Sequence, residues 1–402
     1  MKTSSSRRLR YDFFRGLALL IICYDHIVFQ SNGIPFWGMV TPWYWGFSDA
    51  AEIFIFVSGL TFGLVYTRRF DRFGLWASTR KVIVRAWQIY RAYLLLAVLS
   101  LGVAIGLTTA GPLSLDLVSD LRAAPLDALT SLVFLRGVDD VLPLYVVLVL
   151  LAVPLLALLR RAPAAALAVS GGLYLVSQLA GGGLPVFGDW GFHPLAYQFL
   201  FMIGMYVAVA DAPLPRHRGV TGGLLLLLVA IGLRIWLVPR LIAHGLIGAE
   251  SVLNVPIPAW EAQDKTLLAV HRLLYFLGLA YVTAVLTPAA NAFWQRRIWR
   301  PVLTVGQHAL SVYCFGELLA IVVGGLTKMG GLAPTATLLA ALGGCLLLVG
   351  FAYGMQWWAA PLPTPRDATP PAVSEPPRNG LAVRAAAPDR LPAAPSPNGD
   401  AA

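Results

Sequence analysis

The sequence predicts an all-α integral membrane protein, a polytopic bundle of about ten transmembrane helices. Hydrophobic residues make up 58% of the 402 residues and charged residues 12%, whereas about a quarter of the residues in a soluble domain are charged. Apolar segments of about 20 residues, the length a helix needs to cross roughly 30 Å of hydrocarbon, recur along most of the chain. The predicted spans are 13–30, 49–67, 92–109, 141–159, 164–180, 194–211, 219–239, 267–287, 303–326 and 334–357.

The formal net charge of +10 is explained by where the 30 basic residues fall. With ten spans, most of them lie on the side that also holds the N-terminal arginines, as the positive-inside rule describes for cytoplasmic segments. We therefore place both termini in the cytoplasm and expect membrane lipids, rather than nucleic acid, as partners. The three cysteines all lie within predicted spans and have no metal-site spacing, so no metal is expected.

Three regions follow from this pattern. Residues 1–12 form a basic cytoplasmic N-terminus, and residues 13–358 form the transmembrane domain. Residues 359–402 are rich in proline and alanine without periodicity, which predicts a disordered cytoplasmic tail. The first span carries an Asp-His pair and has no clear small-residue cleavage site, so we expect it to remain in the mature protein. The pattern does not predict an oligomeric state.

The first span carries Arg15, Asp25 and His26, and charged groups within hydrocarbon are expensive and typical of functional sites. Arg15 could instead snorkel to the headgroups, and His26 could simply face other helices. Eleven residues make almost exactly three helical turns, so Arg15 and His26 share one stripe of the helix, roughly 16 Å apart along its axis. Asp25 points about 100° away, and could orient the imidazole indirectly or pair with an arginine on another helix.

The second span begins with Asp49 and Glu52, at the side of the membrane where His26 lies. Their spacing is that of a capping box at a helix start. Two carboxylates beside a histidine would also suit acid-base chemistry or the binding of sugar hydroxyls. Both interpretations stay open at this point.

A basic connection follows this span, and it includes Arg80, Arg85 and Arg91. Most of its charge is explained by topology and lipid headgroups. It is also dense enough to bind a multiply phosphorylated ligand such as coenzyme A, because guanidinium groups match phosphate oxygens. Further polar candidates for the acceptor site or for structural roles are Asp140, His193, Asp264, His271, Arg272 and Glu317.

Six segments, in order and spacing, resemble the OpgC family of inner-membrane proteins. They are YDFFRGLALLIICYDHIVF, GFSDAAEIFIFVSGLTFGL, DDVLPLYVVLVLLAVPLL, HPLAYQFLFMIGMYVA, DKTLLAVHRLLYFLGLAYV and VGQHALSVYCFGELL. Arg15 and His26 are also similar to the R-x10-H motif of the wider acyltransferase-3 superfamily. That superfamily often ends its penultimate-helix motif with a histidine where this chain has Glu317, so the role of Glu317 is not implied by the resemblance.

The resemblance implies an O-acyltransferase of the bacterial inner membrane that succinylates osmoregulated periplasmic glucans. Succinyl-CoA would be the cytoplasmic co-substrate, with no bound cofactor, and the glucan would be the periplasmic acceptor. Arg15 would help to bind the donor and His26 would act as catalytic base. We expect Asp25, Asp49 or Glu52 to hold the imidazole, and Arg80, Arg85 and Arg91 to assist Arg15.

Two other interpretations fit the same features. An acetyl-CoA-dependent acyltransferase could modify a different envelope polysaccharide. A polytopic transporter could instead use the intramembrane charges to line a substrate or proton path, without covalent chemistry.

Overall fold

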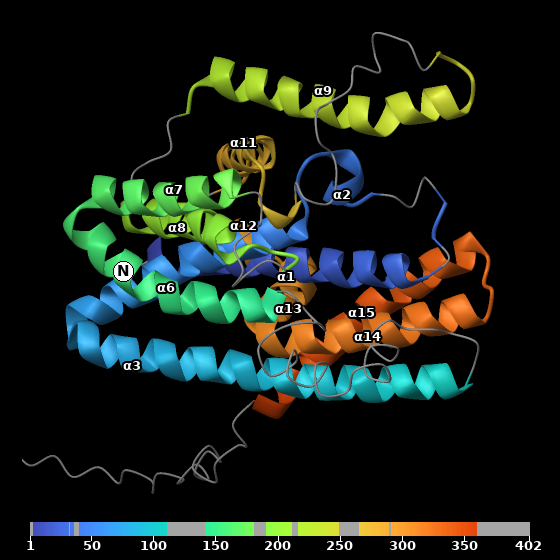
Figure 1. Cartoon of the computed structure of the whole chain (residues 1–402), viewed down its shortest axis with the longest axis horizontal. Coiled ribbons are helices and arrows are strands. Elements are labelled where there is room, and N and C mark those ends of the chain that lie inside the picture. Colours follow the sequence, from blue (N-terminus) through green and yellow to red (C-terminus); the bar gives the residue numbers. More distant parts are fainter. Residues whose placement is uncertain are drawn as a thin grey trace, which may run out of the picture. The chain divides into compact units, whose positions relative to one another are not determined.

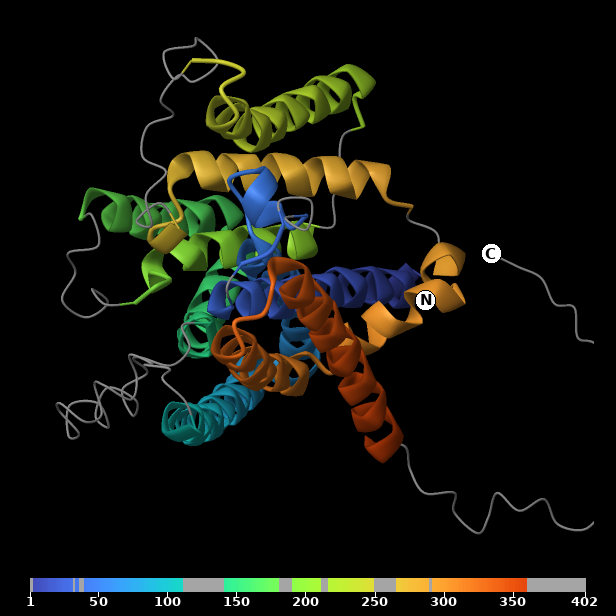
Figure 2. The same ribbon diagram turned by 90° about the vertical axis from the view of Figure 1, so that its right-hand side faces the viewer.

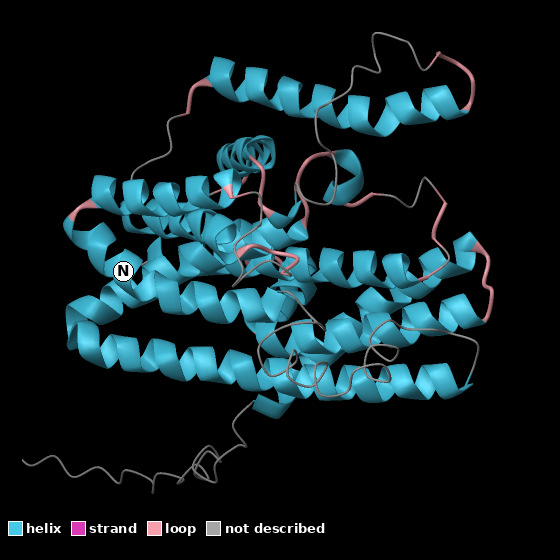
Figure 3. Cartoon of the chain, viewed as in Figure 1, coloured by secondary structure: helices cyan, strands magenta, loops and turns pink. Residues whose placement is uncertain are grey.

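The computed structural model describes residues 3–31, 33–35, 40–110, 141–180, 190–210, 216–248, 265–288 and 291–359. In this part of the chain the secondary structure is helical, with loops and no strand (Figure 3). The helices are α1 (Thr3–Gln30), α2 (Pro42–Trp45), α3 (Ala50–Ala110), α6 (Val141–Arg161), α7 (Pro163–Leu179), α8 (Pro194–Ala210), α9 (Arg218–Ala243), α11 (Val270–Leu286), α12 (Asn291–Trp294), the 3-10 helix η3 (Arg297–Trp299), α13 (Arg300–Gln307), α14 (Ala309–Met329) and α15 (Pro334–Ala359). The all-α prediction is therefore confirmed for the described residues.

Five of the described helices are long and apolar enough to cross a membrane: α3, α6, α9, α14 and α15. The apolar helices α7, α8 and α11 are shorter, with 17 residues each. Each of the ten predicted spans overlaps a helix, but two of them lie in α3 and the ninth is divided between α13 and α14. These helices indicate a membrane protein. The count of ten spans and the orientation of the termini stay predictions.

The predicted basic connection between the second and third spans is helical. α3 runs through it and reverses at Gly74, where φ is 77° and ψ is 171° (Figure 1). A side chain would be strained at this backbone conformation, which glycine adopts readily. The reversal lets both arms of α3 pack within one bundle.

Glycines set the closest helix contacts around α1 and α3. A Cβ added to Gly59 of α3 would lie 2.1 Å from the carbonyl oxygen of Phe201 on α8, and one added to Gly306 of α13 would lie 1.8 Å from that of Asp12 on α1. Small residues at such positions let helix backbones approach closely. Gly59 and Gly306 therefore permit the close approach of α3 to α8 and of α13 to α1.

α1 lies inside the bundle, where it packs against α3, α13, α14 and α15. The second view separates these neighbours and shows α11 running across the top of the group with α9 above it (Figure 2). α9 packs on α11 and α2, partly through parallel rings of Trp45 and Trp236, whose centroids are 4.8 Å apart. Within the bundle, Arg15 of α1 contacts Thr61 of α3, and His26 of α1 contacts Glu317 of α14.

Candidate active site

The two polar ends of the α1 stripe line two different cavities. Arg15 lines a cavity of about 200 Å³, which we call the Arg15 cavity, between α1, α3, α6 and α14. His26 lines a second cavity of about 350 Å³, the His26 cavity. The polar lining of the His26 cavity consists of Asp25, His26, Gln30, Asp49, Lys265, Tyr313 and Glu317.

The carboxylate in contact with the catalytic candidate His26 belongs to Glu317 of α14. His26 Nδ1 lies 2.8 Å from one carboxylate oxygen of Glu317 and 2.9 Å from the other. The imidazole side chain is 38% exposed and the glutamate side chain 14%. When Nδ1 donates its hydrogen to Glu317, Nε2 carries the lone pair, which is the form of imidazole that accepts a proton.

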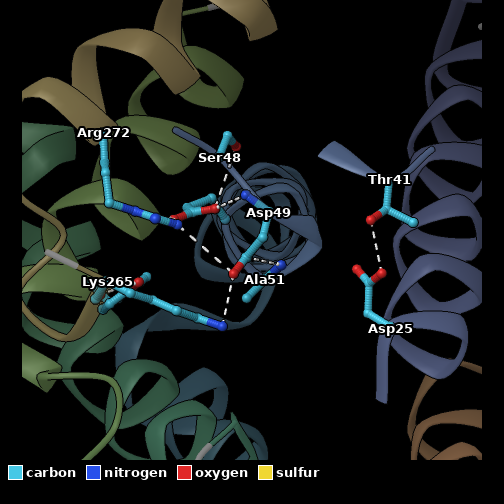
Figure 4. A network of polar contacts seen from close by, with 9 residues as sticks. Asp25, Thr41, Ser48, Asp49, Ala51, Lys265 and Arg272 are labelled. Atoms are coloured by element: carbon cyan, nitrogen blue, oxygen red, sulfur yellow. Dashed lines mark hydrogen bonds and ion pairs between the residues drawn. The ribbon is translucent and has the colours of Figure 1, made fainter. Parts of the chain in front are cut away.

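The three carboxylates expected to hold the imidazole have other partners in the structure. Asp25 accepts a hydrogen bond from the Thr41 hydroxyl at 2.8 Å (Figure 4). Asp49 lies 2.8 Å from Lys265 Nζ, and Glu52 accepts a hydrogen bond of 2.5 Å from Arg272. The expected imidazole partner therefore has to be corrected to Glu317, since these groups are engaged with cations or a hydroxyl on other segments.

Asp49 and Glu52 form the capping box that their spacing predicts. The Ala51 N–H donates to Asp49 Oδ1 at 2.7 Å, and the Asp49 N–H donates to Glu52 Oε2 at 2.5 Å. Two N–H groups at the start of α3 are thereby satisfied. Asp49 also lines the His26 cavity, so it has a capping role and a place at the site.

The capping box continues into a buried ionic cluster formed by Asp49, Glu52, Lys265 and Arg272 (Figure 4). Arg272 Nε and Nη2 both donate to Glu52 Oε1, at 3.1 and 2.5 Å, and Nη2 lies 3.8 Å from Asp49. Glu52 has no exposed surface. The cluster ties the start of α3 to the start of α11 and to the segment just before α11 that carries Lys265, which forms part of the His26 cavity wall.

Glu52→Gln is expected to destabilise the fold. The substitution leaves the buried guanidinium of Arg272 without its main counter-charge, and breaking a buried ion pair from one side costs about 3–5 kcal/mol. Asp71→Asn provides the matched control, because Asp71 pairs with Arg160 at the surface and exposed pairs contribute about 0–1 kcal/mol. Thermal unfolding in one detergent should show a clear fall in Tm for Glu52→Gln and little change for Asp71→Asn; equal shifts would contradict a structural role for Glu52.

Of the four arginines expected to bind the donor, Arg15 and Arg85 line the Arg15 cavity. Arg15 Nη2 donates to the Thr61 hydroxyl at 2.6 Å, and Nη1 lies 3.6 Å from Asp12. Arg80 and Arg91 are exposed on the second arm of α3 and are not among the residues that line this cavity. The structure thus brings two of the four predicted donor-binding arginines, Arg15 and Arg85, to the same cavity.

The remaining candidates occupy different positions. His193 is buried just before α8, where its carbonyl accepts the N–H groups of Ala196 and Tyr197, and burial lowers the pKa of its imidazole. His271 packs edge-on against the ring of Phe47, with centroids 4.9 Å apart. Neither histidine is among the residues that line the two cavities. The predicted positions Asp140 and Asp264 lie outside the described residues.

Three polar residues that line the His26 cavity were not among the predicted site residues: Gln30, Lys265 and Tyr313. Lys265 is the cation of the His26 cavity wall, and Tyr313 lines both cavities. Tyr313 comes four residues before Glu317, so the two share one face of α14. This spacing could have identified Tyr313 once Glu317 was in view. No comparable spacing points to Lys265.

The fold and the cavities define a helical membrane protein with a histidine–carboxylate pair in one polar cavity and two arginines in another. Residues 7–360 match the OpgC protein family, and the chain belongs to that family. This confirms the resemblance and implies a glucan-modifying function of the acyltransferase type. No curated protein and no solved structure matches the chain.

Proposed function

We propose that the protein is an O-acyltransferase that moves a succinyl group from succinyl-CoA onto a hydroxyl of a periplasmic glucan. The observation that carries the proposal is the placement of Arg15 and the His26–Glu317 pair on the two cavities, at opposite ends of one stripe of α1. The separation of roughly 16 Å along the helix is comparable with an extended pantetheine arm. An acyl-CoA bound through its phosphates at one end could therefore present its thioester at the other.

His26 would act as general base. In this mechanism Nε2 removes the proton of the glucan hydroxyl while its oxygen attacks the thioester carbonyl carbon. The carbon–sulfur bond then breaks, and the proton passes from the imidazole to the departing thiolate, so that the products are the glucan ester and free CoA thiol. A positioned imidazole contributes typically 10²- to 10⁴-fold to such a step, and the thioester requires no further activation.

Glu317 would be a positioning residue that acts through His26. Its carboxylate accepts the Nδ1 hydrogen, which holds the ring in the tautomer that presents a basic Nε2. It also stabilises the imidazolium that forms during attack, as the carboxylate does in a serine-protease triad.

Arg15 and Arg85 would bind the phosphates of the donor. Both line the Arg15 cavity, and guanidinium groups form paired hydrogen bonds to phosphate oxygens. The acceptor would enter the His26 cavity, where carboxylates and Lys265 can form hydrogen bonds with sugar hydroxyls. The succinyl donor, the periplasmic acceptor and the inner-membrane location are what the resemblance to the family implies, and they are part of the proposal.

The direct test is an assay of the purified protein with succinyl-CoA and glucan. We expect CoA thiol to be released in step with glucan ester, and release to require the glucan. If the protein used acetyl-CoA and not succinyl-CoA, the donor would be reassigned to acetyl-CoA. If it modified a different polysaccharide and not the glucan, the acceptor would be reassigned. Absence of thiol release with every acyl-CoA, together with uptake of a solute into proteoliposomes, would favour a transporter.

Arg15→Met is expected to raise KM for the acyl-CoA by about 10- to 100-fold, because it removes a hydrogen bond to a charged group that contributes about 1.5–3 kcal/mol. The value of kcat at saturating donor should change less. Arg161→Met is the control, since Arg161 is exposed at the end of α6. Steady-state kinetics in the same assay check this, and an unchanged KM in Arg15→Met would remove Arg15 from donor binding.

A further inference from the structure

The two cavities are separated by a thin partition in which one residue, Tyr313, lines both sides. On α14, Leu310 lines the Arg15 cavity, Tyr313 lines both and Glu317 lines the His26 cavity. Residues three to four apart on a helix lie about one turn, or 5.4 Å, apart along its axis. The partition at α14 is therefore about one side chain thick.

On the neighbouring helices, too, residues that are close in sequence line different cavities. On α3, Ala51 lines the His26 cavity and Phe54 lines the Arg15 cavity. At the start of α6 the consecutive residues Val141 and Leu142 line the His26 and Arg15 cavities, respectively. Three helices thus place the boundary at one level of the bundle.

Aromatic rings fill this level. The rings of Phe54 and Tyr313 stack with centroids 6.4 Å apart at an interplanar angle of 29°, and both side chains are buried. The ring of Tyr145 on α6 lies 6.0 Å from that of Phe54. Because the partition is formed by side chains, changes of their rotamers can open it without breaking the hydrogen bonds of the helix backbone.

We propose that Tyr313, stacked on Phe54, determines the size of the acyl group that can pass from the Arg15 cavity to the His26 cavity. The inference rests on the proposed function, in which the donor is held at Arg15 and its thioester reacts at His26. A narrow, unbranched acyl group passes the ring, as the pantetheine arm behind it does, and reaches the imidazole. A branched group is too wide to pass the stacked rings, so Tyr313 is a specificity-determining residue for the acyl donor.

Tyr313 is the better position to test than Phe54. It lines both cavities, whereas Phe54 also packs against Tyr145, so that its truncation would disturb a second contact. Tyr313→Ala removes the ring from the boundary between the cavities, and it does not substitute His26 or Glu317. In an apolar site, one methylene of substrate changes selectivity by about 10- to 200-fold.

The experiment compares succinyl-CoA with methylsuccinyl-CoA, which has the same chain length and terminal carboxylate and one methyl branch, in the assay of the purified full chain. We expect the wild-type protein to prefer succinyl-CoA. In Tyr313→Ala, the ratio of kcat/KM for methylsuccinyl-CoA to that for succinyl-CoA should rise by at least about tenfold. Tyr313→Phe, which keeps the ring, should retain the wild-type ratio.

Phe315→Ala is the matched control on the same helix. Phe315 stacks on Phe351 of α15 with centroids 4.3 Å apart, and it is not among the residues that line either cavity. The ratio of the two kcat/KM values in Phe315→Ala should equal the wild-type ratio. If Tyr313→Ala does not fold, Tyr313→Leu provides a smaller change in volume, for which a rise in the same direction is expected.

The outcomes separate the two proposals. An active Tyr313→Ala protein with the wild-type ratio would overturn the role of Tyr313 and leave the acyltransferase proposal intact. Equal use of both donors by the wild-type protein would also overturn it. A wild-type protein that releases no thiol from any acyl-CoA would overturn the proposed function, and the inference about Tyr313 with it.

Discussion

His26→Ala is expected to lower the rate of acyl transfer by about 10²- to 10⁴-fold. The substitution removes the only group in the proposed mechanism that takes the proton from the acceptor hydroxyl. The donor is held at the other end of the α1 stripe, so KM for the acyl-CoA should change little. The measurement is release of CoA thiol by the purified variant with succinyl-CoA and glucan.

His217→Ala is the control for this variant, because His217 is an exposed histidine before α9. It should keep wild-type kcat. Thermal unfolding of both variants should match the wild type, which separates lost chemistry from lost folding. Transfer by His26→Ala at the wild-type rate would contradict the assignment of His26 as the base.

Glu317→Gln is expected to give the second large effect, a fall in kcat of at least about tenfold and up to about 10⁴-fold, the loss found when the corresponding carboxylate of a serine-protease triad becomes an amide. The glutamine amide can donate a hydrogen bond to Nδ1. This favours the tautomer with hydrogen on Nε2, which cannot accept the proton of the hydroxyl. KM for the donor should stay near the wild-type value, because Glu317 is not among the residues that line the Arg15 cavity.

Glu317→Asp tests whether the carboxylate itself is required. It keeps the charge on a shorter side chain, so we expect it to recover part of the kcat that Glu317→Gln loses. Steady-state kinetics on both variants supply the measurement. If Glu317 had only a structural role, both substitutions would lower Tm, and kcat of Glu317→Asp would not exceed that of Glu317→Gln.

Much of the helical architecture could be predicted from the sequence, because runs of apolar residues set helices directly. The secondary structure of the basic connection was not predicted, because its charge indicates topology and says nothing of its backbone. Every residue of α3 except Gly74 continues the helix, and one glycine with positive φ is enough to reverse the chain. The break of the ninth span at His308 was likewise not visible in the hydrophobic pattern.

The site was predicted where local spacing carries the information. The stripe from Arg15 to His26 and the capping box of Asp49 and Glu52 both depend on contacts within one helix. The partner of His26 could not be predicted in this way, because Glu317 is 291 residues away in the sequence. The contact exists because α1 packs against α14, and a tertiary contact of this kind leaves no mark in the local pattern.

The same reason explains the reassignment of Glu52. As a carboxylate near His26 it was a reasonable catalytic candidate, but Arg272, 220 residues farther along the chain, pairs with it. Arg272 was predicted only as an acceptor or structural candidate, and its structural role is the one that the contact supports. The buried ion pair holds the wall of the cavity in which His26 and Glu317 lie.

The central claim is that the pair of His26 and Glu317 transfers an acyl group to a glucan. Mass spectrometry of periplasmic glucans from cells that produce the wild-type protein or His26→Ala tests it most directly. The account predicts glucans carrying the added mass of succinyl groups with the wild-type protein and unmodified glucans with the variant. Identical glucan spectra from the two strains, with both proteins present in the membrane, would contradict it.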